Sequence, residues 1–250
     1  MVTQKKQRAD VLLVAQGLAA SRPRAQALIL SGNVYADHNR IDKAGQSLAS
    51  DTVLRVKGND NPFVSRGGIK LAGALEYFNI QVRGSIVADF GASTGGFTDC
   101  ALQAGAARVY AIDVGYGQLA EKLRRDHRVI CMERTNARHM TANDIPEPVD
   151  IVVIDASFIG LAKLLPAAYS ILKGDGQVVA LLKPQFEVGR EKVGRGVVRD
   201  EAVRQQAALA VKGQAALLGF DVRGQVDSVL MGPKGNREIF LLLQKREIAL

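Results

Sequence analysis

From residue 85 onward, short aliphatic runs alternate with helical segments, and this alternation limits the possible folds more than any other feature of the chain. Strand-type runs lie at 85–90, 108–114, 128–132, 150–155, 177–182, 222–229 and 238–243. Helical segments separate most of them, at 97–104, 118–125, 161–172 and 200–218. Because parallel strands need long crossover connections, the pattern predicts an α/β fold with a mostly parallel seven-stranded sheet. The last two runs are expected to pair as a hairpin.

The start of the chain follows a different pattern and predicts a small α+β unit. Asp10 and Ser21 stand where they would cap two short helices. Short strands are expected after these helices, at 34–35, 41 and 52–56. Residues 58–62 are all turn formers and predict a linker. We therefore expect one domain over 1–60 and a second over 64–250.

Charge and composition limit the partners. The formal net charge is +8, and half of that surplus lies in residues 1–60, which indicates a polyanionic partner, either nucleic acid or a membrane surface. No apolar run approaches the roughly 20 residues of a membrane span, and no signal segment opens the chain, so we expect a cytoplasmic protein. Two cysteines and three histidines predict neither a disulfide framework nor a metal site. Only 5% of residues are aromatic, which argues against base stacking as the main binding device.

A glycine-rich turn, residues 89–96, connects the first predicted strand of the sheet to a helix. Such a turn brings the backbone close to a ligand and presents the N–H groups of the helix N-terminus. The dinucleotide pattern G-x-G-x-x-G fails because Ser93 occupies its middle glycine position, and no Walker lysine follows Gly96. The string D-x-G-x-[SG]-x-G instead resembles motif I of methyltransferases that use S-adenosylmethionine (SAM).

This resemblance implies SAM as the cofactor and assigns residues to it. The candidate loop residues are Asp89, Gly91, Ser93, Gly95, Gly96 and Phe97. The SAM carboxylate would use loop N–H groups, with the sulfonium near Asp89. Asp113 ends the next strand and is placed for the ribose hydroxyls, while Asn136 follows the third strand and is placed for the adenine edge.

Charged residues end two neighbouring strands of the predicted sheet. Asp155 follows one aliphatic run and Lys183 follows the next, so both are expected at the edge where an open α/β sheet binds ligands. Lys70 is expected in the first turn of a helix that starts near Ser65, where the helix dipole disfavours a cation. Glu238 leads into the last strand. The two strand-end residues, Asp155 and Lys183, therefore predict a polar site beside the glycine-rich turn.

Lys70, Asp155, Lys183 and Glu238 resemble the K-D-K-E tetrad of FtsJ-like ribose 2′-O-methyltransferases. The strings at 64–71, 91–99 and 183–187 are similar to the haemolysin-A family, the TlyA-type rRNA methyltransferases. The start of the chain, Arg8-Ala9-Asp10-x-x-Leu13 with the following Gly17-Leu18 and Ser21-Arg22, resembles the S4 RNA-binding domain, although Ala9 replaces the usual leucine. Together the resemblances span nearly the whole chain.

The resemblances imply a Rossmann-like SAM-dependent methyltransferase fold preceded by an S4-like domain. The implied activity is methylation of the ribose 2′-hydroxyl of cytidine in ribosomal RNA, on the large subunit and in some members also the small one; the short ends of the chain favour the large subunit alone. The implied partners are ribosomal RNA or ribosomal subunits, with no membrane and no obligate protein partner. The candidate RNA-binding residues are Arg8, Arg22, Arg24, Arg40, Lys43, Arg66, Arg190, Lys192 and Arg195.

Two roles are open for Lys183 in this chemistry. The enzyme must align the 2′-oxygen with the methyl carbon and sulfur, and it must remove a proton. Free lysine has a pKa of about 10.4, so Lys183 either acts as a base in a special environment or orients the hydroxyl as an ammonium. Asp155 would position Lys183, and Glu238 would position Lys70 or the ribose. Two other functions are weighed: a non-catalytic RNA-binding or ribosome-assembly factor, and a pore-forming haemolysin, which needs membrane-inserting segments.

Overall fold

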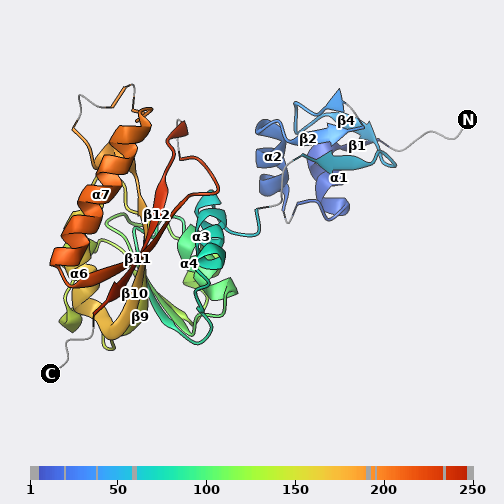
Figure 1. Cartoon of the computed structure of the whole chain (residues 1–250). Coiled ribbons are helices and arrows are strands. Elements are labelled where there is room, and N and C mark those ends of the chain that lie inside the picture. The colour runs from blue at the N-terminus through green and yellow to red at the C-terminus, as the bar shows by residue number, and fades with distance from the viewer. Residues whose placement is uncertain are drawn as a thin grey trace, which may run out of the picture. The chain divides into compact units, whose positions relative to one another are not determined.

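The structure is a computed structural model, and it describes residues 6–19, 21–37, 39–57, 61–189, 193–194, 196–232 and 235–246. The chain divides into two compact units, Met1–Asp60 and Asn61–Leu250 (Figure 1). None of the helices in these ranges combines the length and the apolar character needed to cross a membrane.

The first unit packs two helices against short strands. The helices are α1 (Ala9–Ala15) and α2 (Arg22–Leu30). The strands are β1 (Lys6–Arg8), β2 (Val34–Ala36), β3 (Asn39–Arg40), β4 (Ser47–Ala49) and β5 (Leu54–Val56). They form two sheets, with β1 paired to β4 and β2 lying between β3 and β5. The pairing of β1 with β4 was not predicted, because three-residue strands carry too little periodicity to be recognised. Leu13, Ile29 and Ile41 are buried at the centre of the small aliphatic core.

One predicted helix cap is confirmed and the other is wrong. The Ser21 hydroxyl accepts a hydrogen bond from the Arg24 N–H at 3.4 Å and caps α2. Asp10 instead lies inside the first turn of α1 and is fully buried. Its carboxylate accepts two hydrogen bonds from the Arg8 guanidinium, each 3.0 Å long. A buried carboxylate needs charged partners, and this requirement outweighs its preference for a cap position.

The second unit is built on a seven-stranded sheet in the order β11-β12-β10-β9-β6-β7-β8. Its strands are β6 (Ile86–Phe90), β7 (Arg108–Ile112), β8 (Val129–Met132), β9 (Val149–Ile154), β10 (Leu172–Leu182), β11 (Phe220–Asp227) and β12 (Ile239–Lys245). The five strands from β10 to β8 are parallel, and β12 runs antiparallel to both of its neighbours. This arrangement confirms the predicted sheet and the final hairpin.

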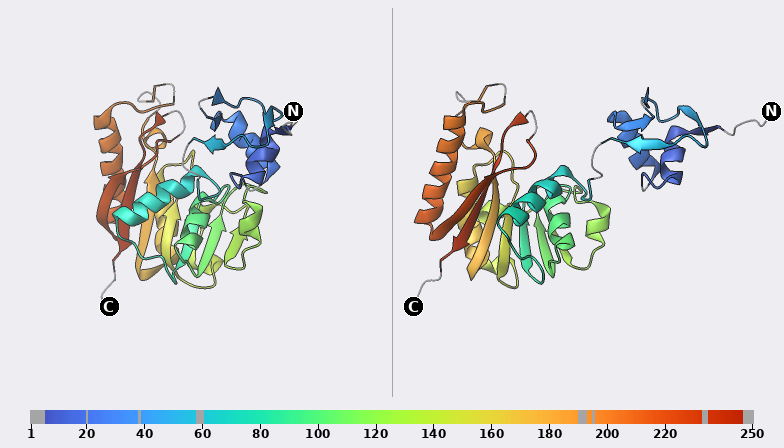
Figure 2. Two further views of the ribbon diagram at one scale, coloured as in Figure 1. Left: turned by 90° about the vertical axis from the view of Figure 1, so that its right-hand side faces the viewer. Right: turned by 45° about the vertical axis from the view of Figure 1, so that its right-hand side comes forward.

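Helices cover both faces of this sheet (Figures 1 and 2). The helices α3 (Arg66–Tyr77), α4 (Gly96–Gln103) and α5 (Glu121–Arg124) contribute to one buried cluster. The helices α6 (Leu165–Ile171) and α7 (Glu201–Leu217) contribute to the other. Short 3-10 turns connect these elements: η1 (Ala137–His139), η2 (Ala142–Asp144), η3 (Leu161–Lys163) and η4 (Pro184–Phe186).

Two predicted helices are shorter than expected. The N–H groups of Gln118 and Leu119 bind the Glu133 carboxylate, so α5 begins only at Glu121. The segment 161–172 divides into η3 and α6, because Pro166 lacks an N–H and fits only the first turn of a helix.

Candidate functional site

The register of the sheet brings three of the four tetrad residues together. Leu182 pairs with Ile239 across β10 and β12, and Ala180 pairs with Ile154 across β10 and β9. Asp155 and Lys183 directly follow the ends of β9 and β10, and Glu238 directly precedes β12. All three therefore lie at one edge of the sheet.

Lys70 joins this group from α3. The Ser65 hydroxyl accepts a hydrogen bond from the Gly67 N–H at 3.3 Å, and the helix begins at Arg66. Lys70 is therefore the fifth helical residue and lies beyond the first turn, contrary to the prediction. It is 7% exposed, and its long side chain points into the tetrad.

The tetrad consists of two ion pairs. Lys70 Nζ lies 2.5 Å from Glu238 Oε2, and the Glu238 side chain is fully buried. Lys183 Nζ lies 2.7 Å from Asp155 Oδ1, and these side chains are 11% and 23% exposed. The two lysines are thus almost equally buried, and Asp155 is the most exposed member of the tetrad.

Lys183 has more acceptors around it than its ion-pair partner. Its Nζ donates to Ser157 Oγ at 2.8 Å and to the Asp155 carbonyl at 3.4 Å, in addition to its contact with the Asp155 carboxylate. Three acceptors match the three hydrogens of an ammonium group. The geometry therefore suits a lysine that donates hydrogen bonds.

A cavity of about 260 Å³ joins the tetrad to the glycine-rich loop. Lys70, Asp155 and Lys183 line one part of it. The candidate cofactor residues that line it are Gly91, Ser93, Gly96 and Phe97. The carboxyl ends of β6 and β9 thus open on one space, as expected for a ligand crevice in an α/β sheet.

The loop lies so close to its neighbours that side chains are excluded at two glycines. A Cβ atom on Gly91, whose φ is +88°, would lie 3.0 Å from the Asp155 carbonyl oxygen and 3.1 Å from Ala156 Cα. A Cβ on Gly96 would lie 2.1 Å from Ser65 Oγ. Ser93 adopts a left-handed conformation with a φ of +48°. The loop is therefore a close-fitting cradle at the N-terminus of α4, which suits the cofactor predicted for it.

A second cavity, of about 460 Å³, is lined by Asp113 and Asn136 as well as by residues of the loop. The Asp113 carboxylate accepts hydrogen bonds from the N–H groups of Ser93, at 2.8 Å, and Gly115, at 2.7 Å. Asn136 Oδ1 accepts a bond from the Arg138 N–H at 3.1 Å. Gly91, Ser93 and Asp155 line both this cavity and the first, so the two form a continuous site.

Two predicted cofactor residues lie beneath the loop and do not line these cavities. Asp89 is fully buried and accepts a 2.7 Å hydrogen bond from Thr98 Oγ1. Burial raises the pKa of its carboxyl to about 7. A Cβ on Gly95 would lie 2.2 Å from Leu123 Cδ1, so this glycine allows α5 to pack against α4. Both residues support the shape of the loop from inside.

The sequence analysis missed Ser157 and Phe158. Ser157 lines the two cavities above and a third, of about 360 Å³, which Glu238 also lines. Phe158 is 91% exposed, has a φ of +66°, and its ring lies 5.2 Å from that of Phe186. An exposed aromatic held in a strained conformation is typical of a functional position. Its position three residues after Asp155 was the available sequence signal.

The candidate RNA-binding residues of the first unit are exposed, and three of them are paired with acids. Arg8 and Arg22 both contact the buried Asp10, at 3.0 and 3.2 Å. Arg40 lies 2.6 Å from Asp42. Arg24 and Lys43 are also exposed. In the second unit, Arg66 lines the first cavity and donates to the Met231 carbonyl at 3.1 Å. Arg190, Lys192 and Arg195 lie outside the described residues.

Comparison with protein-family models confirms both resemblances. Residues 63–246 match the FtsJ-like methyltransferase model, and residues 7–54 match the S4 domain. The first match covers most of the chain and includes all four tetrad residues.

Similar proteins extend over nearly the full length. The 16S/23S rRNA (cytidine-2′-O)-methyltransferase TlyA of Mycobacterium tuberculosis is 48% identical over 96% of this chain and 90% of its own. Hemolysin A of Brachyspira hyodysenteriae is 37% identical over 92% of this chain and 97% of its own. A solved structure from Streptococcus thermophilus that bears the name hemolysin is 44% identical, with a TM-score of 0.77 over 98% of this chain and 90% of its own. The chain belongs to the TlyA and hemolysin A family, in which an S4 domain precedes an FtsJ-like methyltransferase domain.

Proposed function

We propose that the protein is a SAM-dependent rRNA methyltransferase that modifies the ribose 2′-hydroxyl of cytidine. One observation carries this proposal: the ion pairs Lys70–Glu238 and Lys183–Asp155 lie beside the glycine-rich loop, and the same connected cavities reach both. The similar TlyA of Mycobacterium tuberculosis is named for this reaction on 16S and 23S rRNA. The proposal includes a cytoplasmic location, because the proposed substrate is ribosomal RNA.

The residues present fit SAM as the cofactor. The N–H groups of Gly91, Ala92, Ser93 and Gly95 already bind acceptors within the protein, so those of Gly96 and Phe97 at the start of α4 would hold the cofactor carboxylate. Asp113 would accept hydrogen bonds from the ribose hydroxyls, and the Asn136 amide would donate to adenine. When bound, SAM supplies an electrophilic methyl group.

The tetrad would act on the acceptor hydroxyl. Lys183, as an ammonium held by Asp155, would exchange its 3.4 Å bond to the Asp155 carbonyl for one to the 2′-oxygen and orient a lone pair of that oxygen toward the methyl carbon. As the new carbon–oxygen bond forms, the hydroxyl proton becomes acidic and would pass to the Asp155 carboxylate, since an ammonium has no lone pair to accept it. Lys70, held by the buried Glu238, would fix the ribose from the side of α3.

The third cavity offers a place for the acceptor nucleotide. It lies beside Lys183 and Glu238, and the exposed Phe158 ring borders it. The guanidinium and ammonium groups of the first unit would bind RNA phosphates, so binding should weaken as the salt concentration rises. Ribosomal RNA or assembled subunits are the partners this arrangement requires, and no further protein subunit is proposed.

A labelling experiment tests the function directly. Purified protein is incubated with SAM tritiated at the methyl group and with ribosomal subunits that lack their native modifications. The RNA is then hydrolysed with alkali, which cleaves every linkage except one next to a 2′-O-methyl group. We expect label in an alkali-resistant dinucleotide that begins with cytidine. The subunit whose RNA yields this dinucleotide is the substrate.

Other outcomes separate the alternatives. Label on a base would retain the methyltransferase but contradict the proposed role of the tetrad. Absence of label on either subunit, together with SAM binding by calorimetry, would favour a non-catalytic assembly factor. Leakage of lipid vesicles on addition of the protein would favour the pore-forming function.

We expect Asp113→Asn to weaken SAM binding by about 10- to 100-fold, because a hydrogen bond to a charged group contributes roughly 1.5–3 kcal/mol. In addition, the two Asp113 oxygens accept one hydrogen bond each, from the N–H groups of Ser93 and Gly115, whereas an asparagine side chain has only one acceptor oxygen. Isothermal titration calorimetry with SAM measures the effect. Asp221→Asn removes a half-exposed carboxylate on β11, away from these cavities, and should leave SAM affinity unchanged. Equal affinities for the two variants would contradict the assignment of Asp113.

A further inference from the structure

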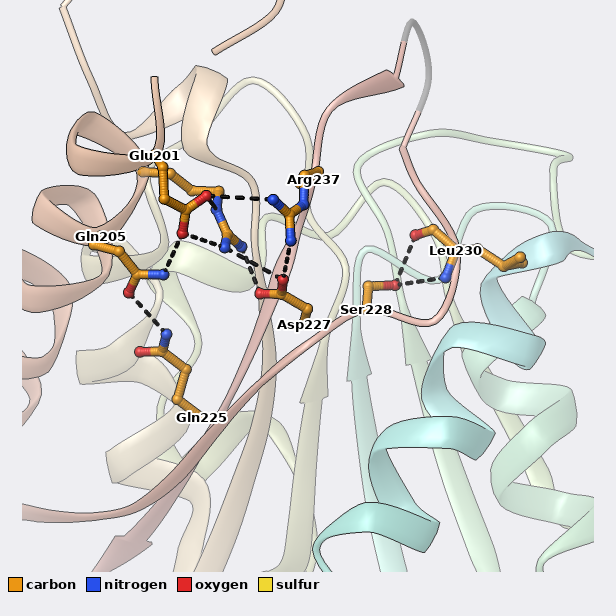
Figure 3. A network of polar contacts seen from close by, with 8 residues as sticks. Glu201, Gln205, Gln225, Asp227, Ser228, Leu230 and Arg237 are labelled. Atoms are coloured by element: carbon orange, nitrogen blue, oxygen red, sulfur yellow. Dashed lines mark hydrogen bonds and ion pairs between the residues drawn. The ribbon is translucent and has the colours of Figure 1, made fainter. Parts of the chain in front are cut away.

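Two carboxylates and two guanidinium groups meet at the start of α7, beside the end of β11 and the beginning of β12 (Figure 3). This clamp consists of Glu201, Arg204, Asp227 and Arg237. Arg204 lies 2.5 Å from Asp227 Oδ1 through Nη1 and 3.2 Å from Oδ2 through Nη2. It also contacts both oxygens of Glu201, at 2.5 and 2.9 Å. Arg237 lies 2.9 Å from Asp227 Oδ2 and 3.5 Å from Glu201 Oε2.

Burial makes the geometry of this clamp specific. Arg204 is 3% exposed, and a buried guanidinium must keep its carboxylate partners. Its fork holds Asp227 through two parallel hydrogen bonds, which fixes the direction of the carboxylate as well as its position. Asp227 in turn holds Arg237, whose side chain is 56% exposed. The position of the Arg237 side chain therefore depends on the position of α7, through Arg204 and Asp227.

Arg237 directly precedes Glu238, so the clamp bears on the tetrad. Asp227 contacts the Arg237 side chain, and the next residue, Ser228, donates its N–H to the Glu238 carbonyl at 2.9 Å. The Glu238 carboxylate is packed against Gly232, where a Cβ would lie 2.1 Å from Oε1. A small displacement of this backbone would thus disturb the 2.5 Å contact between Glu238 and Lys70.

The four residues of the clamp do not line the three cavities of the site. They can act on the reaction only through their neighbours. We propose that Asp227 and Arg237 are positioning residues, which hold the Glu238 carboxylate in the orientation that presents Lys70 to the acceptor ribose. This inference rests on the proposed methyltransferase function.

The test compares Arg237→Gln and Asp227→Asn with the wild type in steady-state methylation of RNA. We expect kcat to fall by about 10-fold in each, because small errors in placement are costly in catalysis. The KM for SAM should remain within about twofold, since the cofactor loop is not contacted. Arg237→Lys keeps the positive charge but contacts Asp227 and Glu201 with one nitrogen in place of two. It should therefore retain more activity than Arg237→Gln. The variant with both changes should be no slower than the slower single variant.

A double-mutant cycle that combines Arg237→Gln with Glu238→Asp shows whether the loss of kcat in Arg237→Gln depends on Glu238. The shorter carboxylate already disrupts the pairing with Lys70, so adding Arg237→Gln should reduce kcat by less than twofold. Arg223→Gln is the matched control. Arg223 also connects β11 and β12, through a 2.9 Å bond to Gln244, but at the other end of the hairpin. We expect its kcat to equal that of the wild type.

Three results would overturn the inference. One is an undiminished tenfold effect of Arg237→Gln in the Glu238→Asp background. Another is a loss confined to the KM for RNA that changes with salt, which would make Arg237 a phosphate contact. The third is wild-type kcat in Arg237→Gln and Asp227→Asn. Absence of methyl transfer by the wild type would instead refute the proposed function, on which the inference depends.

Discussion

Lys183→Met is expected to reduce methyl transfer by about 10²–10⁴-fold, the usual contribution of a group that assists the proton transfer at the reacting hydroxyl. Methionine keeps most of the aliphatic stem, so the variant removes mainly the nitrogen that contacts Asp155 and Ser157. SAM binding should be preserved, because Lys183 does not belong to the glycine loop. Single-turnover transfer of tritiated methyl groups to RNA, with SAM affinity measured by calorimetry, separates the two effects.

Lys173→Met provides a matched control for this experiment. Lys173 pairs with Asp150 at 2.5 Å, so it also joins β10 to β9, but at the opposite end of the strands. It tests the loss of a Lys–Asp pair between the same two strands without touching the site. We expect its activity to match that of the wild type. If Lys183→Met retained activity within threefold of this control, the proposed role of the tetrad would be wrong.

Asp89→Asn is expected to change the pH dependence of stability. Burial raises the pKa of Asp89 to about 7 in the folded protein, from an ordinary value of 3.8. The folded state therefore keeps a proton that the unfolded chain has already released. This contribution to stability is fully present below pH 3.8, declines as the pH rises, and is lost above about pH 7. Between pH 4.5 and 8 the wild type should lose on the order of 2–4 kcal/mol more unfolding free energy than Asp89→Asn.

Urea unfolding at the two pH values measures this difference, with Asp126→Asn as a control of opposite sign. Hydrogen bonding to Arg128 lowers the pKa of Asp126 to about 2, so its contribution is present above pH 3.8 and is lost only as the pH falls toward 2. Asp126→Asn should therefore lower the unfolding free energy equally at pH 4.5 and pH 8. Asp89→Asn should be more stable than the wild type at pH 8. A parallel loss in the wild type and Asp89→Asn would show that Asp89 is ionised throughout this range.

The sheet was predictable because its strands are continuous aliphatic runs that end in residues of a different type. Asp155 and Lys183 each interrupt such a run, so their positions at the sheet edge follow from the pattern alone. The pairing of Lys70 with Glu238 connects residues 168 positions apart, and periodicity contains no information about such a contact. The resemblance to a known tetrad was needed to bring these two residues together.

The errors arose where tertiary contacts compete with local preferences. Asp10 is a good cap residue in isolation, but the folded chain uses it to hold Arg8 and Arg22. Glu133 takes the N–H groups that would have started α5 earlier, and it lies 14 or more residues away along the chain. Ser157 and Phe158 were missed because only the three-dimensional arrangement shows that they border the cavities. Each case depends on contacts of the folded chain that the local residue pattern does not contain.

The place of β12 in the sheet has a consequence for the assembly of the tetrad. This strand is the last of the seven in chain order, yet it lies between β10 and β11 rather than at an edge. A growing chain therefore cannot complete the sheet from one side, and Lys70 remains without Glu238 until the final strand has entered. A sheet without β12 therefore lacks both its antiparallel strand and the Lys70–Glu238 pair, so the tetrad is complete only once this strand has inserted.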